Sequence, residues 1–438
     1  MSSVRSLRRP AAGCLETLLA GQPHLRASPL AWINALRAQA LGRLDVLKLP
    51  TLRDEEWRFT DLSPLTRQSF QSVCSATGLR AADIEPFHIE EATTRLVFVD
   101  GVFAPKLSST LIDGGVMLAN LSAADAAQAA AIEPHLGRHA VFGDNVFAAL
   151  NTSLLQDAAV IMVPRHVTLA APVHLLFVAT QAEVASHPRC VLVAEPGSSM
   201  TLIEDYVALQ DGAYFINPVT EIAVADQAQV KHIRVQRDSA KAVHIANCAV
   251  SAGRSSTYQS VSVALGAQIS RYNLSVLLAE GAECVVDGLA LIADSQLADT
   301  HTSIDHAQPS GVSRQLHKCI VGGSAHAVFN GKVMVRPGAQ RTDSNQSSRN
   351  LLLTGKAQVD AKPQLEIFAD DVKCAHGATI GQIDDDEVFY LKSRGLSDSV
   401  ARNLLTYAFG AEIIDRIPVA SLKHRLEMTM LKQTGSRP

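Results

Sequence analysis

Between about residue 156 and residue 376, the sequence is a succession of short apolar runs rich in β-branched residues. Glycines in turn-like settings recur among these runs, and close neighbours lie 15 or 17 residues apart. No amphipathic pattern of helical length separates the runs. A strand–turn unit of this length predicts a solenoid or a sandwich, and the irregular spacing favours a parallel β-helix over an immunoglobulin-like sandwich. The runs and glycines are VIMV at 160, VHLLFVAT at 173, CVLVA at 190, MTLIEDYV at 200, QVKHIRVQ at 229, VSVAL at 261, SVLLA at 275, AVFNGKVMV at 327, Gly266, Gly281, Gly338 and Gly355.

The two flanks of this region have different patterns. Residues 1–150 are predicted to form a mostly helical N-terminal domain of α/β character, in which LVFVDGVF (96–103) indicates two short strands around an Asp-Gly turn. Residues 151–380 form the expected β-helix core. Residues 381–438 are expected to be helical, with Ser397 as an N-cap before apolar residues at helical spacing up to Ile414, and a second amphipathic helix beyond Pro418. The expected fold class is therefore mainly β, with helical domains at both ends.

Composition excludes several classes of function. The chain has 438 residues, of which 47% are hydrophobic and 19% charged, as is usual for a globular protein with a large core. The formal net charge is −4 and no basic stripe occurs, which argues against nucleic-acid binding. No apolar run is long enough for a membrane span. The seven cysteines are scattered and contain no CxxC pair, so we expect a reducing cytosol. Residues 1–13 carry three arginines and no acid, which only weakly suggests a transit peptide.

Sequence motifs for common catalytic sites are missing. The segments NGKV at 330 and TGKA at 354 lack both the leading glycine and the hydroxyl residue of a phosphate-binding P-loop. No GxSxG nucleophile elbow and no HExxH zinc helix occurs. The chain is therefore not expected to hydrolyse nucleotides by itself.

One short segment, KCAHGATIG (373–381), places a thiol and an imidazole two residues apart. In an extended strand Cys374 and His376 share a face, and Lys373 would favour the thiolate. Two ligands are fewer than the four that zinc or iron–sulfur coordination normally needs, so any remaining ligands would come from elsewhere, for instance a second chain. An alternative is a cytosolic β-helix lyase or hydrolase that uses Asp370, Asp371 and His376.

Other cysteines and histidines have a simpler interpretation. Cys248, Cys284 and Cys319 are flanked by apolar residues, so we expect them to be buried small hydrophobes even where a histidine lies nearby, as His317 does. The same interpretation, packing at an interface without metal, remains open for Cys374 and His376.

Residues 341–409, from RTDSNQSSRNLLLTGKAQVD to SVARNLLTYAF, resemble the signature region of the SufB/SufD family of iron–sulfur cluster assembly proteins. The segment DEEWRFTDLSPL (54–65) resembles the entry region of the same family. Where SufB-type chains have a cysteine this chain has Arg349, and where they have two glutamates it has Ala375 and Gly377. The chain is thus similar to the SufD side of the family.

The resemblance implies a right-handed parallel β-helix in a complex of one SufB, two copies of the ATPase SufC and one SufD. It implies a non-catalytic scaffold, with ATP on SufC only and a transient iron–sulfur cluster at the SufB–SufD interface, to which Cys374 and His376 contribute. A reduced flavin in the complex and a self-dimer of the isolated chain are further expectations. Location in a bacterial cytoplasm is favoured over a plastid. The C-terminal region expected to receive SufC contains Tyr390, Arg394, Leu404, Leu405 and Phe409.

Overall fold

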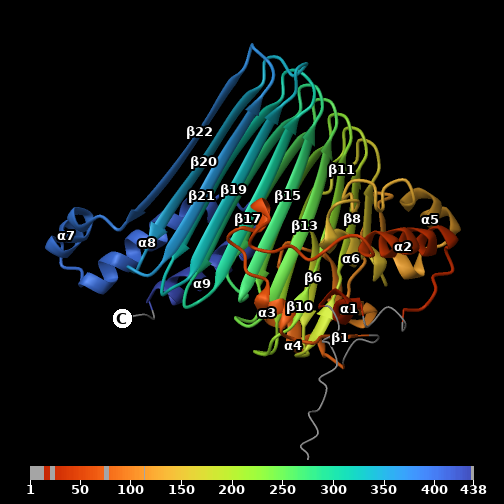
Figure 1. Cartoon of the computed structure of the whole chain (residues 1–438), viewed down its shortest axis with the longest axis horizontal. Coiled ribbons are helices and arrows are strands. Elements are labelled where there is room, and N and C mark those ends of the chain that lie inside the picture. The colour runs from red at the N-terminus through yellow and green to blue at the C-terminus, as the bar shows by residue number, and fades with distance from the viewer. Residues whose placement is uncertain (1–13, 20–24, 74–77, 113, 436–438) are drawn as a thin grey trace, which may run out of the picture.

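The computed structural model describes residues 14–19, 25–73, 78–112 and 114–435, and the arginine-bearing start of the chain lies outside these ranges. Two long sheets form a parallel β-solenoid of about eight coils, to which each coil contributes one strand per sheet (Figure 1). The prediction of a mainly β chain with a parallel β-helix core and helices at both ends is confirmed.

Odd-numbered strands build most of sheet A and even-numbered strands most of sheet B. Sheet A contains β4 (Met117–Asn120), β5 (Ala159–Val163), β8 (Arg189–Ala194), β11 (Val219–Val224), β13 (Val243–Ala252), β15 (Ile269–Leu278), β17 (Leu297–His306), β19 (His326–Val335) and β21 (Gln358–Ile367), with the short β1 (Gln71–Ser72), β7 (Val184–Ser186) and β10 (Phe215–Ile216) beside them. Sheet B contains β3 (Val102–Phe103), β2 (Thr94–Val99), β6 (Val173–Ala179), β9 (Ser199–Ala208), β12 (Gln229–Arg237), β14 (Thr257–Ala264), β16 (Glu283–Ile292), β18 (Val312–Val321), β20 (Asp343–Leu352) and β22 (Lys373–Gln382).

The helices flank the solenoid. They are α1 (Cys14–Leu18), α2 (Ala31–Leu44), α3 (Ser63–Thr66), α4 (Ala81–Ile84), α5 (Ala126–Ile132), α6 (Val146–Ser153), α7 (Asp385–Ser393), α8 (Asp398–Ile414) and α9 (Ala420–Gly435). The two predicted C-terminal helices are confirmed, and the Ser397 hydroxyl caps α8 by accepting a hydrogen bond from the Val400 N–H. The Asp-Gly turn is confirmed as well, because β2 and β3 pair antiparallel around Asp100 and Gly101.

The register of sheet B shows how the sequence repeat relates to the fold. Glu283 pairs with Val312, Val312 with Asp343 and Asp343 with Lys373, so one coil takes about 30 residues. The glycine spacing of 15 or 17 residues therefore corresponds to half a coil, that is, one strand and one turn. Successive strand–turn units of the sequence therefore belong alternately to sheet A and to sheet B.

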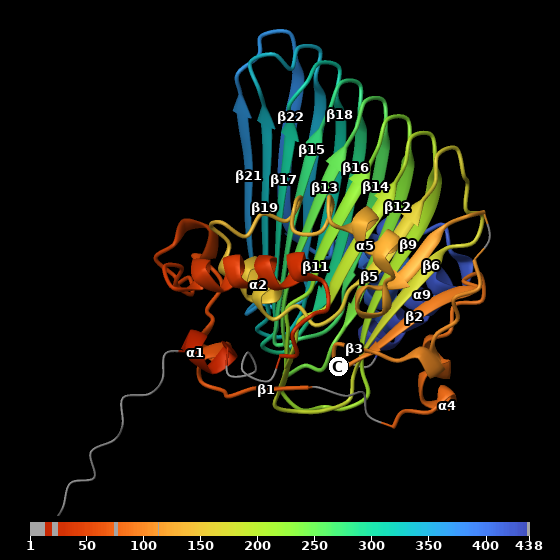
Figure 2. The ribbon, with the colours of Figure 1, turned by 90° about the vertical axis from the view of Figure 1, so that its right-hand side faces the viewer.

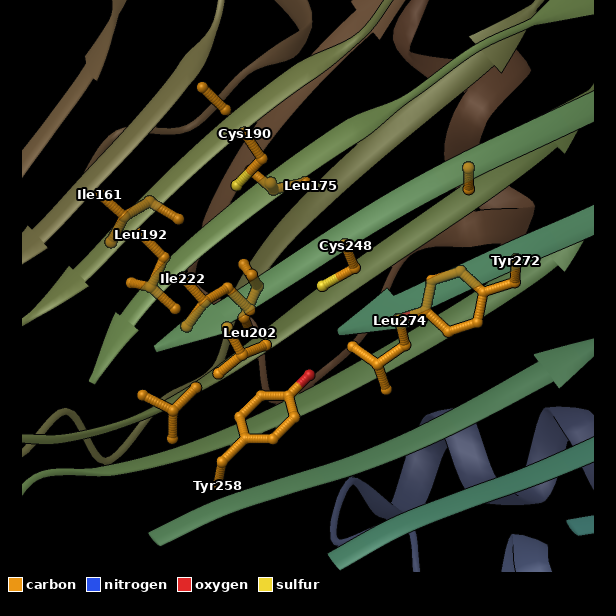
Figure 3. Close-up of a cluster of buried hydrophobic side chains, with 14 of the residues drawn as sticks. Ile161, Leu175, Cys190, Leu192, Leu202, Ile222, Cys248, Tyr258, Tyr272 and Leu274 are labelled. Atoms are coloured by element: carbon orange, nitrogen blue, oxygen red, sulfur yellow. The ribbon is translucent and has the colours of Figure 1, made fainter. Parts of the chain in front are cut away.

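The interior of the first coils is a dense apolar core. Cys190 and Cys248 lie there among leucine, isoleucine and tyrosine side chains from both sheets (Figure 3). Burial also raises the pKa of the Cys284 and Cys319 thiols to about 12. All four of these cysteines are buried, as the sequence predicts for Cys248, Cys284 and Cys319, and the protonated thiols behave as small hydrophobic side chains.

Towards the last coils the interior becomes polar. The Ser313 hydroxyl donates to the Ser344 hydroxyl at 2.8 Å, and the Gln346 amide donates to Gln315 at 2.8 Å. All four residues are buried. These hydrogen bonds pair polar side chains inside the solenoid, although Gln315 Nε2 and Gln346 Oε1 have no partner there, so strands such as β20 carry hydrophilic residues on a buried face.

The C-terminal helices cover the outer face of sheet B. Apolar residues of α8 and α9, among them Ile413, Ile414 and Leu426, pack on Ile233, Val263 and their neighbours in the sheet. Helix α7 lies to the side, beyond the last strands (Figure 1). None of the described helices is long and apolar enough to cross a membrane.

The two ends of the solenoid differ. At the first coil the edge strands of both sheets are followed by antiparallel partners, β4 beside β5 and β3 beside β2. At the other end β21 and β22 are the last strands of their sheets (Figure 2). Most residues of β22 are exposed. An uncovered strand edge presents unpaired backbone N–H and C=O groups, which makes this end a template for pairing with another chain.

Candidate functional site

Cys374 and His376 lie on β22, the last strand of sheet B, at the open end of the solenoid. In the β20–β22 pairing, Cys374 is opposite Ser344 and His376 is opposite Gln346. Both β20 residues are buried inside the solenoid. Because neighbours in register point to the same side of a sheet, Cys374 and His376 continue the inward-facing rows of side chains to the point where the solenoid ends.

The two candidate ligands differ in exposure. Cys374 is half-buried and packs against the apolar cluster of Val333, Val335 and their neighbours, whereas His376 is exposed. Burial raises the pKa of the Cys374 thiol, and the nearby Asp343 carboxylate adds to this effect. The expectation that Lys373 favours the thiolate is wrong. Adjacent residues of a strand point to opposite faces, so the Lys373 side chain is directed away from the thiol, and burial is the main cause of the raised pKa.

The described part of the chain contains no group of three or more His, Cys, Asp or Glu side chains arranged to hold a metal ion. Cys190, Cys248, Cys284 and Cys319 are buried, and burial lowers the pKa of His317 to about 3. Cys374 and His376 therefore form at most a partial ligand set. A complete site at this end of the solenoid needs groups from another molecule.

Asp370 and Asp371 lie in the exposed turn between β21 and β22. Arg341 donates its backbone N–H to the Asp371 carbonyl, so this turn is fixed by the turn of the preceding coil. The acidic run that follows β22 begins helix α7, where the Asp384 carboxylate accepts the Asp386 N–H. The Asp384 carboxylate therefore has a local structural role as the N-cap of α7.

The C-terminal residues named from the sequence fall into two groups. Tyr390 on α7 and Leu404 on α8 are 58% and 45% exposed, and the guanidinium of Arg394 lies over the Tyr390 ring. Leu405 and Phe409 are partly buried. The Phe409 ring lies 4.4 Å from the Lys318 ammonium, and its carbonyl accepts a hydrogen bond from that group, so Phe409 faces sheet B. Phe389 and Val400 add to the exposed apolar surface, at 73% and 47%.

Sequence reasoning missed the role of residues 54–60, here named the strap. The strap crosses the outer face of sheet A, where the Arg271 guanidinium lies 3.8 Å from the Trp57 ring centroid. His301 pairs with Glu56 at 3.1 Å, and the Thr60 hydroxyl donates to Asp299. The strap borders a groove of about 1040 Å³, which is also lined by residues 139–141 and 144–148. In the sequence, only the cluster of acids around a tryptophan in DEEWRF could have indicated this role. The sheet A residues that the strap contacts lie more than 200 positions further along the chain.

Arg349, which the sequence comparison expected at the place of a cysteine in SufB-type chains, lies on β20. Its guanidinium is 3.5 Å from the Glu412 carboxylate of α8. In β20, Arg349 alternates with the buried Ser348 and Asn350, so it lies on the outer face of sheet B and not inside the solenoid.

Comparison with protein families and curated proteins gives a consistent result. Residues 177–409 match the model of the SufBD core domain of the SUF system for FeS cluster assembly, and residues 19–175 match the SufBD protein N-terminal region. A SufBD family iron–sulfur cluster assembly protein of Synechocystis is 42% identical over 91% of this chain and 90% of its own length. The iron–sulfur cluster assembly protein SufD of Escherichia coli is 34% identical, with 89% and 90% covered. The chloroplastic protein ABCI7 of Arabidopsis thaliana is 33% identical, with 90% and 85% covered.

Proposed function

Because this chain belongs to the SufBD family of iron–sulfur cluster assembly proteins, we propose that it is the SufD-type scaffold of a SufB–SufC–SufD complex. In this role the chain holds half of the site at which a nascent cluster forms and performs no catalysis itself. The observation that carries the proposal is the position of Cys374 and His376 on β22, the uncovered last strand of sheet B. Iron and sulfide are the cargo of this site.

SufB is the proposed partner at the open end. The edges of β21 and β22 have backbone groups available for pairing, and a second β-solenoid with the same coil shape would continue both sheets. Such pairing brings ligands of the second chain opposite Cys374 and His376. The same open edge supports a self-dimer when the chain is isolated.

SufC is the proposed partner of helices α7 and α8. Phe389, Tyr390, Val400 and Leu404 are large apolar or aromatic side chains that remain exposed on these two helices. Apolar residues gathered on one surface are typical of a protein–protein contact. In this arrangement ATP binds to SufC, and this chain needs no phosphate-binding loop.

The chemistry of the two side chains suits a transient cluster. His376 offers an imidazole, and an imidazole in its neutral form binds iron without a proton being lost. The Cys374 thiol has a raised pKa, so metal binding there must displace its proton. We expect His376 to be the primary iron ligand and Cys374 to bind only when iron or the partner chain promotes deprotonation.

Family membership favours this function over a β-helix lyase that uses Asp370, Asp371 and His376. We also propose that reduced flavin supplies electrons to the complex. Its proposed location is a bacterial cytoplasm. The relatives include a chloroplastic protein, so localisation of a fluorescent fusion is the direct check of the compartment.

The test is co-expression of the chain with its SufB and SufC, followed by anaerobic purification and assay of bound iron and sulfide. Three variants are compared with wild type: His376→Gln, Cys374→Ser and the control His326→Gln. His326 pairs with Asp360 at 2.7 Å on sheet A, away from β22. We expect all variants to form the complex, and cluster content to fall about tenfold or more for His376→Gln only.

Unchanged cluster content in both His376→Gln and Cys374→Ser would contradict the half-site and leave the chain as a scaffold without ligands. Failure of the wild-type chain to bring down SufB and SufC would contradict the whole proposal. Cleavage of an acidic polysaccharide by the purified chain would then favour the lyase.

A further inference from the structure

Glu412, in the last turn of α8, connects this helix to two neighbouring strands of sheet B. Its carboxylate pairs with the Lys318 ammonium of β18 and lies 3.5 Å from the Arg349 guanidinium of β20. Lys318 and Arg349 are opposite each other in the β18–β20 pairing. One acidic side chain on the helix therefore bridges cations on two adjacent strands.

A second ion pair attaches the helix end to sheet B, and the Arg416 guanidinium that forms it also lies 3.8 Å from the Glu412 carboxylate. Arg416, just beyond α8, pairs at 2.7 Å with Asp287 of β16, which is only 2% exposed. The apolar contacts of α8 and α9 with sheet B add to this attachment. The helices are therefore docked through β16 and the apolar core, and the contact between Glu412 and Arg349 is not needed to hold them in place.

The contact with Arg349 connects Glu412 to β20, which is the neighbour of the candidate-site strand β22. Arg349 is opposite Thr379 of β22, and the amide of the next residue, Asn350, donates a hydrogen bond to the Thr379 carbonyl at 3.0 Å. β22 is the last strand of sheet B and forms its ladder with β20. A displacement of β20 is therefore passed to β22 through the backbone ladder and through Asn350.

We propose that Glu412 is a positioning residue, which links α8 through Arg349 and β20 to the strand that carries Cys374 and His376. A partner that binds α7 and α8 moves the Glu412 carboxylate toward or away from Arg349. This movement changes how firmly β22 is held in the sheet. The inference rests on the proposed function for the identity of that partner, but the link itself is a property of the isolated chain. Arg349 thus has a mechanical role in this link.

The two ion pairs of Glu412, one with Lys318 and one with Arg349, differ in strength. Lys318 is only 4% exposed, and a paired buried charge is costly to separate. Arg349 and Glu412 are 51% and 40% exposed, and exposed pairs are weak. The ion pair between Glu412 and Arg349 therefore breaks first. Its loss frees β20 and β22 from α8, while α8 stays docked on the sheet.

Hydrogen–deuterium exchange of the isolated full-length chain tests the link. We compare wild type with Arg349→Gln, Arg349→Lys and Glu412→Gln. The matched control is Glu427→Gln, on α9, whose carboxylate lies 3.7 Å from His424 of the same helix. For Arg349→Gln we expect exchange in residues 343–352 and 373–382 to accelerate about two- to fivefold, with α8 unchanged. Arg349→Lys keeps the charge and should restore slow exchange, whereas Glu412→Gln should accelerate exchange in both strands and in α8.

Unchanged exchange of β20 and β22 in both Arg349→Gln and Glu412→Gln would overturn the proposal. Addition of SufC separates this failure from that of the proposed function. If SufC binds and alters β22 exchange equally in wild type and in Arg349→Gln, the link does not transmit and the inference is wrong. If SufC does not bind wild type, the proposed function fails, and the exchange of the isolated chain still decides whether Glu412 positions β22.

Discussion

At the residue scale, His301 shows how the strap is held on sheet A. Its imidazole lies between the Asp299 carboxylate at 2.9 Å and the Glu56 carboxylate at 3.1 Å. Burial alone would lower the pKa of His301, but the charge of Asp299 and the hydrogen bonds to both acids outweigh burial and raise it. The pKa of Asp299 itself is lowered to about 2, mainly by Arg271 and against the effect of its own burial, so this carboxylate stays charged above acidic pH.

The raised pKa of His301 makes the strap sensitive to pH. A folded-state pKa above the unfolded value of about 6.5 means that the stabilisation is fully present below that pH and disappears as pH rises through the folded value. We expect His301→Gln to lower the free energy of unfolding by about 1–2 kcal/mol at pH 6, and by less at pH 9. Urea unfolding at both pH values measures this difference. His424→Gln, an exposed control, should have no effect, and an equal loss for His301→Gln at both pH values would contradict the charged pair.

At the scale of elements, a buried ion pair attaches the N-terminal region to sheet A. The Glu221 carboxylate on β11 pairs with Arg189 on β8 and accepts the backbone N–H groups of Gly137, Arg138, His139 and Ala140. Both charged side chains are completely buried. A carboxylate with this many donors stays ionised, and its loss would leave the Arg189 guanidinium buried without a counter-charge.

We therefore expect Glu221→Gln to lower the free energy of unfolding by about 3–5 kcal/mol. Urea unfolding measures the loss, and limited proteolysis should cut between residues 133 and 146 faster than in wild type. Glu283→Gln, at an exposed position on β16, is the control. A stable Glu221→Gln variant with wild-type proteolysis would mean that other contacts hold this region.

The turns of the solenoid use glycine for different reasons. A Cβ on Gly266 would lie 2.3 Å from the backbone oxygen of Asp238, in the turn of the neighbouring coil, whereas a Cβ on Gly338 would meet no atom within 4 Å. Both glycines were assigned to turns from the sequence in the same way. Only Gly266 is required by a close approach of two backbones.

We expect Gly266→Ala to lower the free energy of unfolding by about 1–3 kcal/mol, because backbone atoms cannot move aside as a flexible side chain can. Gly338→Ala should be neutral or slightly stabilising. Thermal and urea unfolding of the two variants provide a matched comparison. Equal effects of the two substitutions would show that the turn at Gly266 relaxes freely.

At the scale of the whole molecule, the solenoid is closed at one end and open at the other. Ile380 on β22 continues an inward-facing row that includes the buried Cys319 and Asn350, yet it is 50% exposed because no further coil follows. Such a residue is exposed only as long as the end is unpaired. Burial of apolar surface at this end is the expected driving force for pairing with another solenoid.

We expect Ile380→Asp to prevent self-association of the isolated chain, because a charge on this row would be buried at the joint between two solenoids. Sedimentation equilibrium measures the association. The unfolding free energy of the monomer should change by less than about 0.5 kcal/mol, since the position is half-exposed there. Leu277→Asp, at an exposed position on β15 away from the open end, is the control. Equal dimerisation of wild type and Ile380→Asp would place the contact elsewhere.

The sequence by itself determined features that depend on near neighbours. Period-two alternation put Cys374 and His376 on one face, and the Ser397 cap with its apolar stripe predicted α8. The β-branched runs identified strands such as β9 and β19. It did not identify β20, written DSNQSSRNLL, because its buried face is hydrophilic and its partners Gln315 and Ser313 belong to another coil.

Only the tertiary structure decided which surroundings each of these residues meets. Several features depend on segments that are tens of positions apart in the sequence. They are the half-coil repeat, the open end at β22, the effect of Asp343 on Cys374 and the bridge from Glu412 to Lys318 and Arg349. The strap and sheet A are joined over more than 200 positions. Local propensity extends over a few residues, whereas burial, charge pairing and strand order are set by packing of the whole chain. A pair of ligands could therefore be found by inspection of the sequence, but its position at an unpaired edge could not.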